Sequence, residues 1–171
     1  MKSESKIIRL VEQILHDCNI GHAPVPIEQI PKHLGLFVVY KPLESTLSSC
    51  LYRNRSRSVI GINTLQNDNI KRLALAHQIG HFLLHDGILG VDRSVLFKFR
   101  NTVSSENDSD ETEANLFANE ILMPRKFIAR GLESVDTIDV LDETFLSDMS
   151  KRYKVSSQTL LLRLNNLGYI L

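Results

Sequence analysis

The sequence has no tryptophan, only two cysteines and no excess of either charge, and these scarcities exclude several classes of protein. Cys18 and Cys50 are too few and too far apart for a disulfide framework, so they fit a reducing cytoplasm; a zinc site on two thiols without a CxxC spacing is a minor alternative. Zero net charge gives no indication of a nucleic-acid or membrane surface. No apolar run approaches the length that spans a bilayer, and the N-terminus lacks the apolar stretch of a signal peptide. We therefore expect a cytoplasmic protein.

The composition and the sequence patterns indicate an ordinary globular protein with a small sheet. Of 171 residues, 43% are hydrophobic and 23% charged, which suits one domain or one domain with a small appendage. Residues 3–18 carry apolar side chains at helical spacing. Three β-branched or aromatic runs follow, separated by polar turn residues: Leu36–Tyr40, Ser49–Tyr52 and Ser58–Ile62. We expect these runs to form a small antiparallel sheet.

The rest of the sequence favours helices. Asn67 is a candidate N-cap for a helix over residues 70–85 that ends at Gly87. A second helix is predicted from Ser109 to Leu122, stopped before Pro124. Shorter helical patterns cover residues 124–131, 137–153 and 157–167, whereas residues 88–108 hold an apolar patch and an acidic loop. The fold class is therefore α+β, with a small antiparallel sheet beside the 70–85 helix and a helical C-terminal portion.

The sequence His77-Gln78-Ile79-Gly80-His81 lies inside the predicted 70–85 helix. Histidines at positions i and i+4 lie on one face of a helix, so both imidazoles can reach one metal ion. This is the HExxH arrangement of zinc peptidases with glutamine in place of glutamate. On their own, two such histidines are equally compatible with hydrogen-bonded side chains that bind no metal.

A third ligand is expected from another element, because catalytic zinc usually takes three protein ligands and keeps a fourth position open. The helix from Ser109 offers Glu111, with Asn115 one turn later to hydrogen-bond a ligand histidine. Glu113 points away from Glu111 by about 200° of helix rotation, so both cannot face one ion. Glu111 is therefore the better candidate for the third ligand.

Two long motifs in the right order resemble the ImmA/IrrE family of metallopeptidases. They are AHQIGHFLLH over residues 76–85 and ETEANLFANEILMP over residues 111–124, against the family patterns AHELGHxLLH and ExxANxFAxxLLMP. The resemblance covers about residues 5–130. It implies a zincin-like domain over residues 1–131, followed by a helical segment, 132–171, packed on it. It also implies a cytoplasmic protease that cleaves a helix-turn-helix transcriptional repressor, with Zn²⁺ held by His77, His81 and Glu111.

Gln78 is the departure from the family motif that bears on activity, because it occupies the position of the general base. An amide cannot take up a proton at neutral pH, and general acid–base catalysis contributes on the order of 10²–10⁴ in rate. We therefore expect a chain that still binds metal and substrate but is catalytically impaired. Gln78 fits either an engineered isosteric change or a natural loss of catalysis. In the second case, the chain would be a pseudopeptidase that sequesters a repressor. Mn²⁺ also suits two imidazoles and a carboxylate.

Other residues near the motifs allow more than one interpretation. His85 follows His81 by one turn and is interpreted as a structural or supporting histidine rather than a ligand. Ser58–Asn63 is either an edge strand that pairs with substrate or an ordinary strand. Tyr52 could stabilise an oxyanion, but a half-buried sheet tyrosine is the simpler interpretation.

The C-terminal residues 146–171 resemble a helix-turn-helix with a local basic bias from Lys151, Arg152, Lys154 and Arg163. A DNA reader needs base-contacting side chains early in its second helix, and Ser157-Gln158-Thr159 are merely compatible. Because the whole chain is neutral, we favour a packing or substrate-docking role over DNA binding. The sequence leaves the oligomeric state open.

Overall fold

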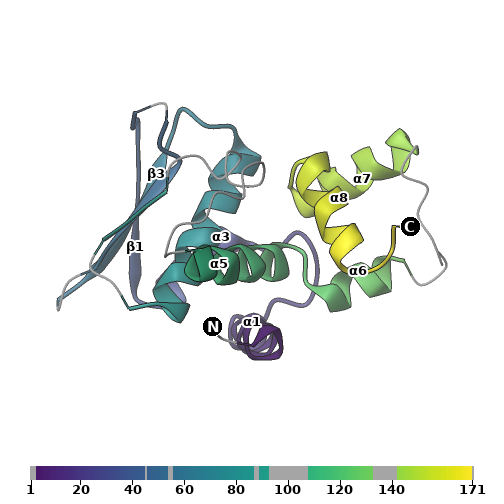
Figure 1. Cartoon of the computed structure of the whole chain (residues 1–171), viewed down its shortest axis with the longest axis horizontal. Helices are drawn as coiled ribbons and strands as arrows, with labels where there is room; N and C mark the ends of the chain where they lie inside the picture. Colours follow the sequence, from purple (N-terminus) through teal and green to yellow (C-terminus); the bar gives the residue numbers. More distant parts are fainter. Residues whose placement is uncertain are drawn as a thin grey trace.

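The computed structural model describes residues 3–44, 46–53, 56–86, 89–92, 108–132 and 142–170. A small sheet lies at one end of the molecule, helices α3 and α5 lie beside it, and the C-terminal helices lie at the other end (Figure 1). In chain order the elements are α1 (Glu4–Asp17), the 3-10 helix η1 (Ile27–Gln29), α2 (Ile30–His33), β1 (Leu36–Lys41), β2 (Ser49–Arg53), β3 (Ser58–Asn63), α3 (Asp68–Leu84), β4 (Leu89–Asp92), α5 (Asp108–Leu122), α6 (Arg125–Gly131), α7 (Glu143–Tyr153) and α8 (Ser157–Asn166).

The α+β class and the three predicted strands are confirmed, together with the helices that the sequence indicated. Strand β4 was not predicted. Helix α3 ends at Leu84 because His85 is already extended, with φ −127° and ψ 148°. The predicted stop at Gly87 is therefore too late, and Gly87 itself lies outside the described residues, as do residues 93–107 and 133–141.

The sheet is mixed, so the prediction of a wholly antiparallel sheet is wrong in one pairing. The strand order is β1-β3-β2-β4, in which β1 runs parallel to β3 while β2 runs antiparallel to both of its neighbours. Strand β3 is therefore central. The alternative in which Ser58–Asn63 forms a substrate-binding edge is wrong, since β1 and β4 are the edges.

The buried side chain of Asn63 holds the loop that joins β1 to β2 across the end of β3. The chain leaves β1, crosses the end of β3 and returns as β2, and Asn63 at that end is fully buried. Its amide group donates to the carbonyl of Glu44 at 3.2 Å and to that of Leu47 at 2.7 Å. Its Oδ1 accepts from the backbone N–H of Leu43 at 3.1 Å and of Leu65 at 3.0 Å. One side chain thus supplies the hydrogen bonds that the crossing loop lacks.

The two faces of the sheet differ because side chains alternate along each strand. Leu51, Ile60 and Ile62 are buried on the face that contacts α3. Phe37 and Tyr52 lie at the opposite positions of the alternation and are 62% and 43% exposed. Tyr52 therefore points away from the helix that carries the two histidines. Of the two interpretations of Tyr52, the structure supports a sheet tyrosine.

The C-terminal helices contact the rest of the chain through a buried ion pair. Arg163 of α8 and Glu120 of α5 are 3% and 1% exposed and pair directly, and Arg163 Nε donates to the carbonyl of Met123 at 3.2 Å. Side-chain caps begin both C-terminal helices, since Asp142 accepts from the N–H of Phe145 and Ser156 from that of Thr159. Arg163 is thus unavailable for phosphate contacts. The domain division near residue 131 stays a prediction.

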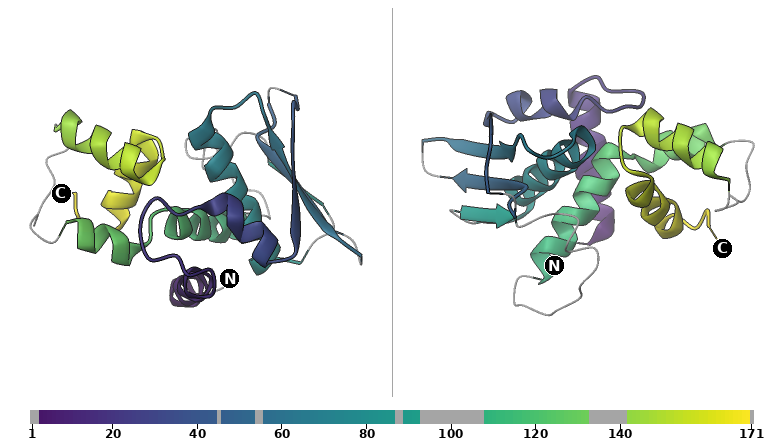
Figure 2. Two further views of the ribbon diagram at one scale, coloured as in Figure 1. Left: turned by 180° about the vertical axis from the view of Figure 1, so that it is seen from behind. Right: turned by 90° about the horizontal axis from the view of Figure 1, so that it is seen from above.

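Figure 2 shows the same arrangement from behind and from above, with the sheet and the C-terminal helices at opposite ends. Within the described ranges, no helix is both long enough and apolar enough to cross a membrane.

Replacing Asn63 by alanine is expected to destabilise the chain by about 2–4 kcal/mol, because backbone groups of the crossing loop lose the hydrogen bonds that the Asn63 side chain makes with them. Urea denaturation followed by circular dichroism measures the change. Asn166→Ala, at an exposed position at the end of α8, is the matched control and should change stability by less than about 0.5 kcal/mol. Equal stability of the two variants would contradict this account of the loop.

Candidate metal centre

The centre is built on helix α3, whose first turn is fixed by the Asn67 side chain, which accepts from the N–H of Ile70 at 3.0 Å. His77 and His81 lie one turn apart on this helix, and their Nε2 atoms are 2.9 Å from each other. His77 is only 1% exposed, whereas the His81 side chain is 17% exposed. The pair thus reaches from the interior to the surface, as a site open to substrate requires.

Gly80 allows helix α5 to pack unusually close to the two histidines. A Cβ atom at position 80 would lie 3.1 Å from the Cα and from the carbonyl oxygen of Ala114, and 3.2 Å from the Phe117 ring. These distances are shorter than ordinary van der Waals contacts between such atoms. The missing side chain therefore brings the backbone of α5, and with it Glu111, close to the imidazoles.

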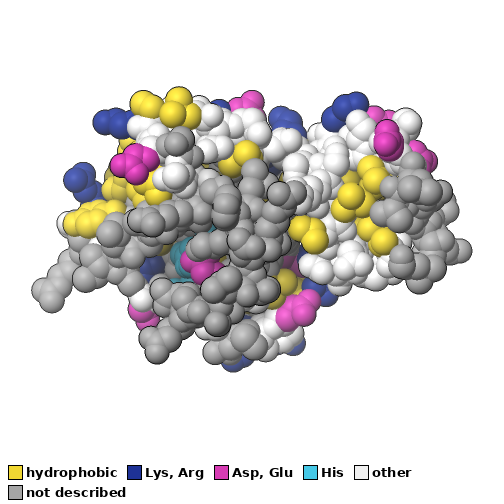
Figure 3. Space-filling view, turned by 45° about the horizontal axis from the view of Figure 1, so that its top comes forward, with side chains coloured by type: hydrophobic (Ala, Val, Ile, Leu, Met, Phe, Trp, Pro, Cys, Tyr) yellow, Lys and Arg dark blue, Asp and Glu magenta, His cyan; other side chains and the backbone are white. Residues whose placement is uncertain are grey.

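Glu111 completes a group of three potential metal ligands. Its Oε2 lies 3.4 Å from His77 Nε2 and its Oε1 lies 3.4 Å from His81 Nε2. One donor atom from each residue lies within 4.8 Å of the others. Ligand atoms about 2.0 Å from a tetrahedral ion lie about 3.3 Å apart, so these donors suit a zinc-sized cation. Histidine and acidic side-chain atoms reach the surface next to one another on the face in Figure 3.

A buried carboxylate stands behind the histidines. The Nδ1 atoms of His81 and His85 are 3.1 Å apart, and His85 Nε2 lies 3.2 Å from Glu113 Oε2. Glu113 is 4% exposed. The hydrogen-bonded series from Glu113 to His85 to His81 fixes the tautomer of His81. The Nε2 atom of His81 is then left directed at Glu111. Glu111 and Glu113 therefore face different partners, as the helix rotation predicted.

Arg53 of β2 holds the end of α3 that carries His81 and His85. Its guanidinium donates to the carbonyl of His85 at 3.1 Å and to that of Phe82 at 2.6 Å, and it lies 4.7 Å from the Phe82 ring centre. Helix-terminal carbonyls lack intrahelical partners, so a cation there satisfies them and complements the helix dipole. No local pattern in the sequence indicates this role of Arg53, because the strand and the helix meet only in the fold.

Gln78 lies in the interior between α3 and the sheet. It is 1% exposed, and its Nε2 donates to the hydroxyl of Ser49 on β2 at 3.0 Å. Its Oε1 is buried and accepts no hydrogen bond within the described part of the chain. Ser49 itself is fully buried and was not among the residues singled out from the sequence. The side chain at position 78 is thus held on one side and free to accept on the other.

The structure brings His77, His81 and Glu111 together and places His85 next to His81; their role as metal ligands stays a prediction. Asn115 is partly buried, and the described contacts include no hydrogen bond from it to His77 or His81. Its expected part in orienting a ligand histidine stays a prediction. The partner that orients His81 is His85, backed by Glu113, a residue that the sequence analysis set aside.

Comparisons with known proteins agree with this geometry. The family model described as the IrrE N-terminal-like domain, Peptidase_M78, matches residues 31–165. A Mycobacterium tuberculosis transcriptional regulator has the same fold, with a TM-score of 0.64 and 16% identity over 94% of this chain. The match covers 46% of that protein, so this chain spans less than half of its length. A search of curated proteins gives no match.

Gly80→Ala is expected to force α3 and α5 apart by a few tenths of an ångström and to cost about 1–3 kcal/mol of stability. The matched control is Gly21→Ala, because a Cβ at Gly21 meets nothing within 4 Å. Thermal and urea unfolding of both variants measure the difference. A Gly80→Ala protein as stable as the control would show that the close helix contact is not needed for the fold.

Proposed function

Because this chain belongs to the IrrE N-terminal-like family of peptidases, we propose that His77, His81 and Glu111 form a zinc metallopeptidase centre. The observation that carries the proposal is the convergence of the three donor atoms within 4.8 Å across two helices. Two imidazoles and a carboxylate are a common ligand set for catalytic zinc, and Mn²⁺ is the alternative ion. The two free thiols, Cys18 and Cys50, fit a cytoplasmic protein.

When bound, the ion supplies Lewis acidity that polarises a peptide carbonyl and acidifies water. The chain's own residues supply the rest. Glu113 and His85 keep His81 in the tautomer that presents Nε2. Arg53 keeps the end of α3 in place against the sheet. The side chain at position 78 would have to accept a proton from water and pass it to the leaving amine.

Gln78 cannot perform that proton transfer, so we propose that this chain hydrolyses peptides at most slowly. Its amide group is held by Ser49, and its buried carbonyl oxygen accepts no hydrogen bond from the described residues. Glutamine and glutamate have nearly the same shape, so the exchange leaves the packing around position 78 intact. Recognition of substrate is therefore separated from its cleavage.

The proposed substrate is a helix-turn-helix transcriptional repressor, which the chain would cleave if position 78 carried a carboxylate. Support comes from the family membership and from the motifs that resemble ImmA/IrrE proteins. The regulator that shares the fold is described as transcriptional, and at 16% identity this likeness supports the fold alone. Direct DNA binding is not part of the proposal, since Arg163 is buried in an ion pair with Glu120.

A second function, sequestration of the repressor without cleavage, is favoured by Gln78 itself. The residue is well packed and hydrogen-bonded, so the site tolerates it without distortion. A chain with an intact metal centre and no general base would hold its partner instead of cutting it. The two functions differ only in the fate of the bound repressor.

The metal is tested by elemental analysis of the purified chain after incubation with zinc and removal of excess ion. We expect about one zinc per chain, lost in His81→Ala because one of three ligands is removed. His22→Ala, at an exposed histidine remote from the centre, should keep the full amount. Absence of bound zinc in the parent chain would refute the metal centre.

Catalysis is tested by Gln78→Glu in the zinc-loaded chain, mixed with a candidate repressor from the same genome. We expect cleavage at a rate about 10²–10⁴ higher than that of the parent chain, since the carboxylate restores proton transfer. Gln29→Glu makes the same chemical change at an exposed position and should leave the rate unchanged. A zinc-loaded Gln78→Glu chain that retains the repressor on a column and leaves it intact would support sequestration and exclude the peptidase.

A further inference from the structure

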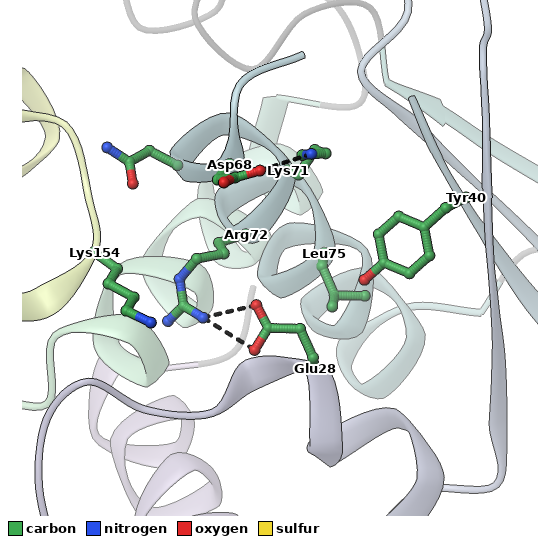
Figure 4. A pocket seen from close by; sticks show the side chains of 8 residues that line it. Glu28, Tyr40, Asp68, Lys71, Arg72, Leu75 and Lys154 are labelled. Atoms are coloured by element: carbon green, nitrogen blue, oxygen red, sulfur yellow. Dashed lines mark hydrogen bonds and ion pairs between the residues drawn. The ribbon is translucent and has the colours of Figure 1, made fainter. Parts of the chain in front are cut away.

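A cavity of about 510 Å³ lies away from the metal centre, where several parts of the chain meet. Glu28 of η1, Tyr40 of β1, the first turns of α3 and Lys154 of the α7–α8 turn surround it (Figure 4). Its volume falls in the range of small-molecule sites, which commonly occur where separate structural units adjoin. Nothing in the peptidase chemistry uses these residues.

The cavity is lined by three cations, and two of them form ion pairs with carboxylates beside it. Arg72 pairs with Glu28 at 2.7 Å, and Lys71 pairs with Asp68 at 2.7 Å. Lys154 also lines the cavity, and within the described ranges it forms no ion pair. Three cations against two carboxylates make the cavity net positive, so it favours a ligand that carries negative charge.

Arg72 supplies a second, independent sign of a missing acceptor. The residue is 8% exposed, and one terminal nitrogen donates to Glu28 while the other donates to the carbonyl of Val25 at 2.7 Å. Its Nε is buried and has no hydrogen-bond partner among the residues that the structure describes. An unsatisfied donor on a buried cation is costly, and it adds to the positive character of this wall of the cavity.

Lys154 occupies a backbone position where glycine is the usual residue. Its φ of 53° and ψ of 52° place it in the left-handed region at the end of α7. This backbone conformation is unfavourable for most residues other than glycine and asparagine. Glycine there would close the helix equally well. The lysine instead places an ammonium group at the wall of the cavity, opposite the sheet.

Tyr40 and Leu75 form the remaining wall. Tyr40 is 47% exposed, so its ring offers a face for an apolar or planar group. Burial raises the pKa of its hydroxyl, and the charge of Glu28 adds to the effect, so the hydroxyl remains a hydrogen-bond donor at neutral pH. The cavity thus combines a positive end with an apolar side.

We propose that this cavity binds a small organic oxyanion, a phosphate or carboxylate on a planar body, between Lys154 and Arg72. The ligand would link the C-terminal segment, through Lys154, to helix α3, through Arg72. Helix α3 also carries His77 and His81, so an occupied cavity fixes the C-terminal segment against the helix of the metal centre. This binding does not depend on the metal or on the residue at position 78.

The test is isothermal titration of the full chain with two probes, phenyl phosphate and benzoate, which separate the two oxyanion classes. We expect one probe to bind saturably at a 1:1 ratio. In Lys154→Gln its affinity should fall about tenfold or more, because a charged hydrogen bond is lost. Lys151→Gln makes the same change on an exposed lysine outside the cavity and should bind as the parent does.

Lys154→Gly separates loss of binding from loss of folding. Glycine relieves the left-handed backbone, so this variant should unfold at a temperature no lower than that of the parent and still lose the probe. The proposal is overturned if neither probe binds saturably, or if the Lys154 variants bind as tightly as Lys151→Gln. Either result leaves the zinc measurements on the metal centre unaffected.

Discussion

The close contact between α3 and α5 at Gly80 is the constraint on which the metal centre depends. Any helix can carry two histidines one turn apart. The carboxylate of Glu111 lies on another helix, so helix packing must place it at ligand distance from them. A Cβ at position 80 would meet the backbone of Ala114 at 3.1 Å, so the helices approach as closely as they do only because glycine is there. The same contact directs Glu113 to His85. One small residue therefore positions both the third ligand and the support of the second.

Buried polar side chains hold the elements around this contact. Asn63 closes the loop that makes the sheet mixed, Arg53 ties the end of α3 to β2, and the pair of Arg163 with Glu120 attaches the C-terminal helices to α5. Each is buried or partly buried and donates hydrogen bonds to groups of another element or loop. Such networks specify an arrangement more than they stabilise it, because any alternative packing leaves a buried charge or amide unsatisfied.

Gln78 separates the two roles that a peptidase centre combines. His77, His81 and Glu111 have the arrangement of a candidate metal site, and the side chain at position 78 keeps the shape of glutamate and a hydrogen bond to Ser49. What is missing is one ionisable oxygen. In the proposed function, cleaving a repressor and holding it therefore differ only in the chemistry of that single group.

Local sequence determined the elements and the ligand candidates, because helix periodicity, N-caps and the spacing of His77 and His81 depend only on near neighbours. It also indicated Glu111 through rotation along one helix. Tertiary structure alone decided the parallel pairing of β1 with β3, the pairing of His85 with Glu113 and the burial of Gln78 against Ser49. It likewise decided the meeting of Lys154 with Arg72 around one cavity. Each of these contacts joins residues far apart in the chain, and their distances are set by how the elements pack.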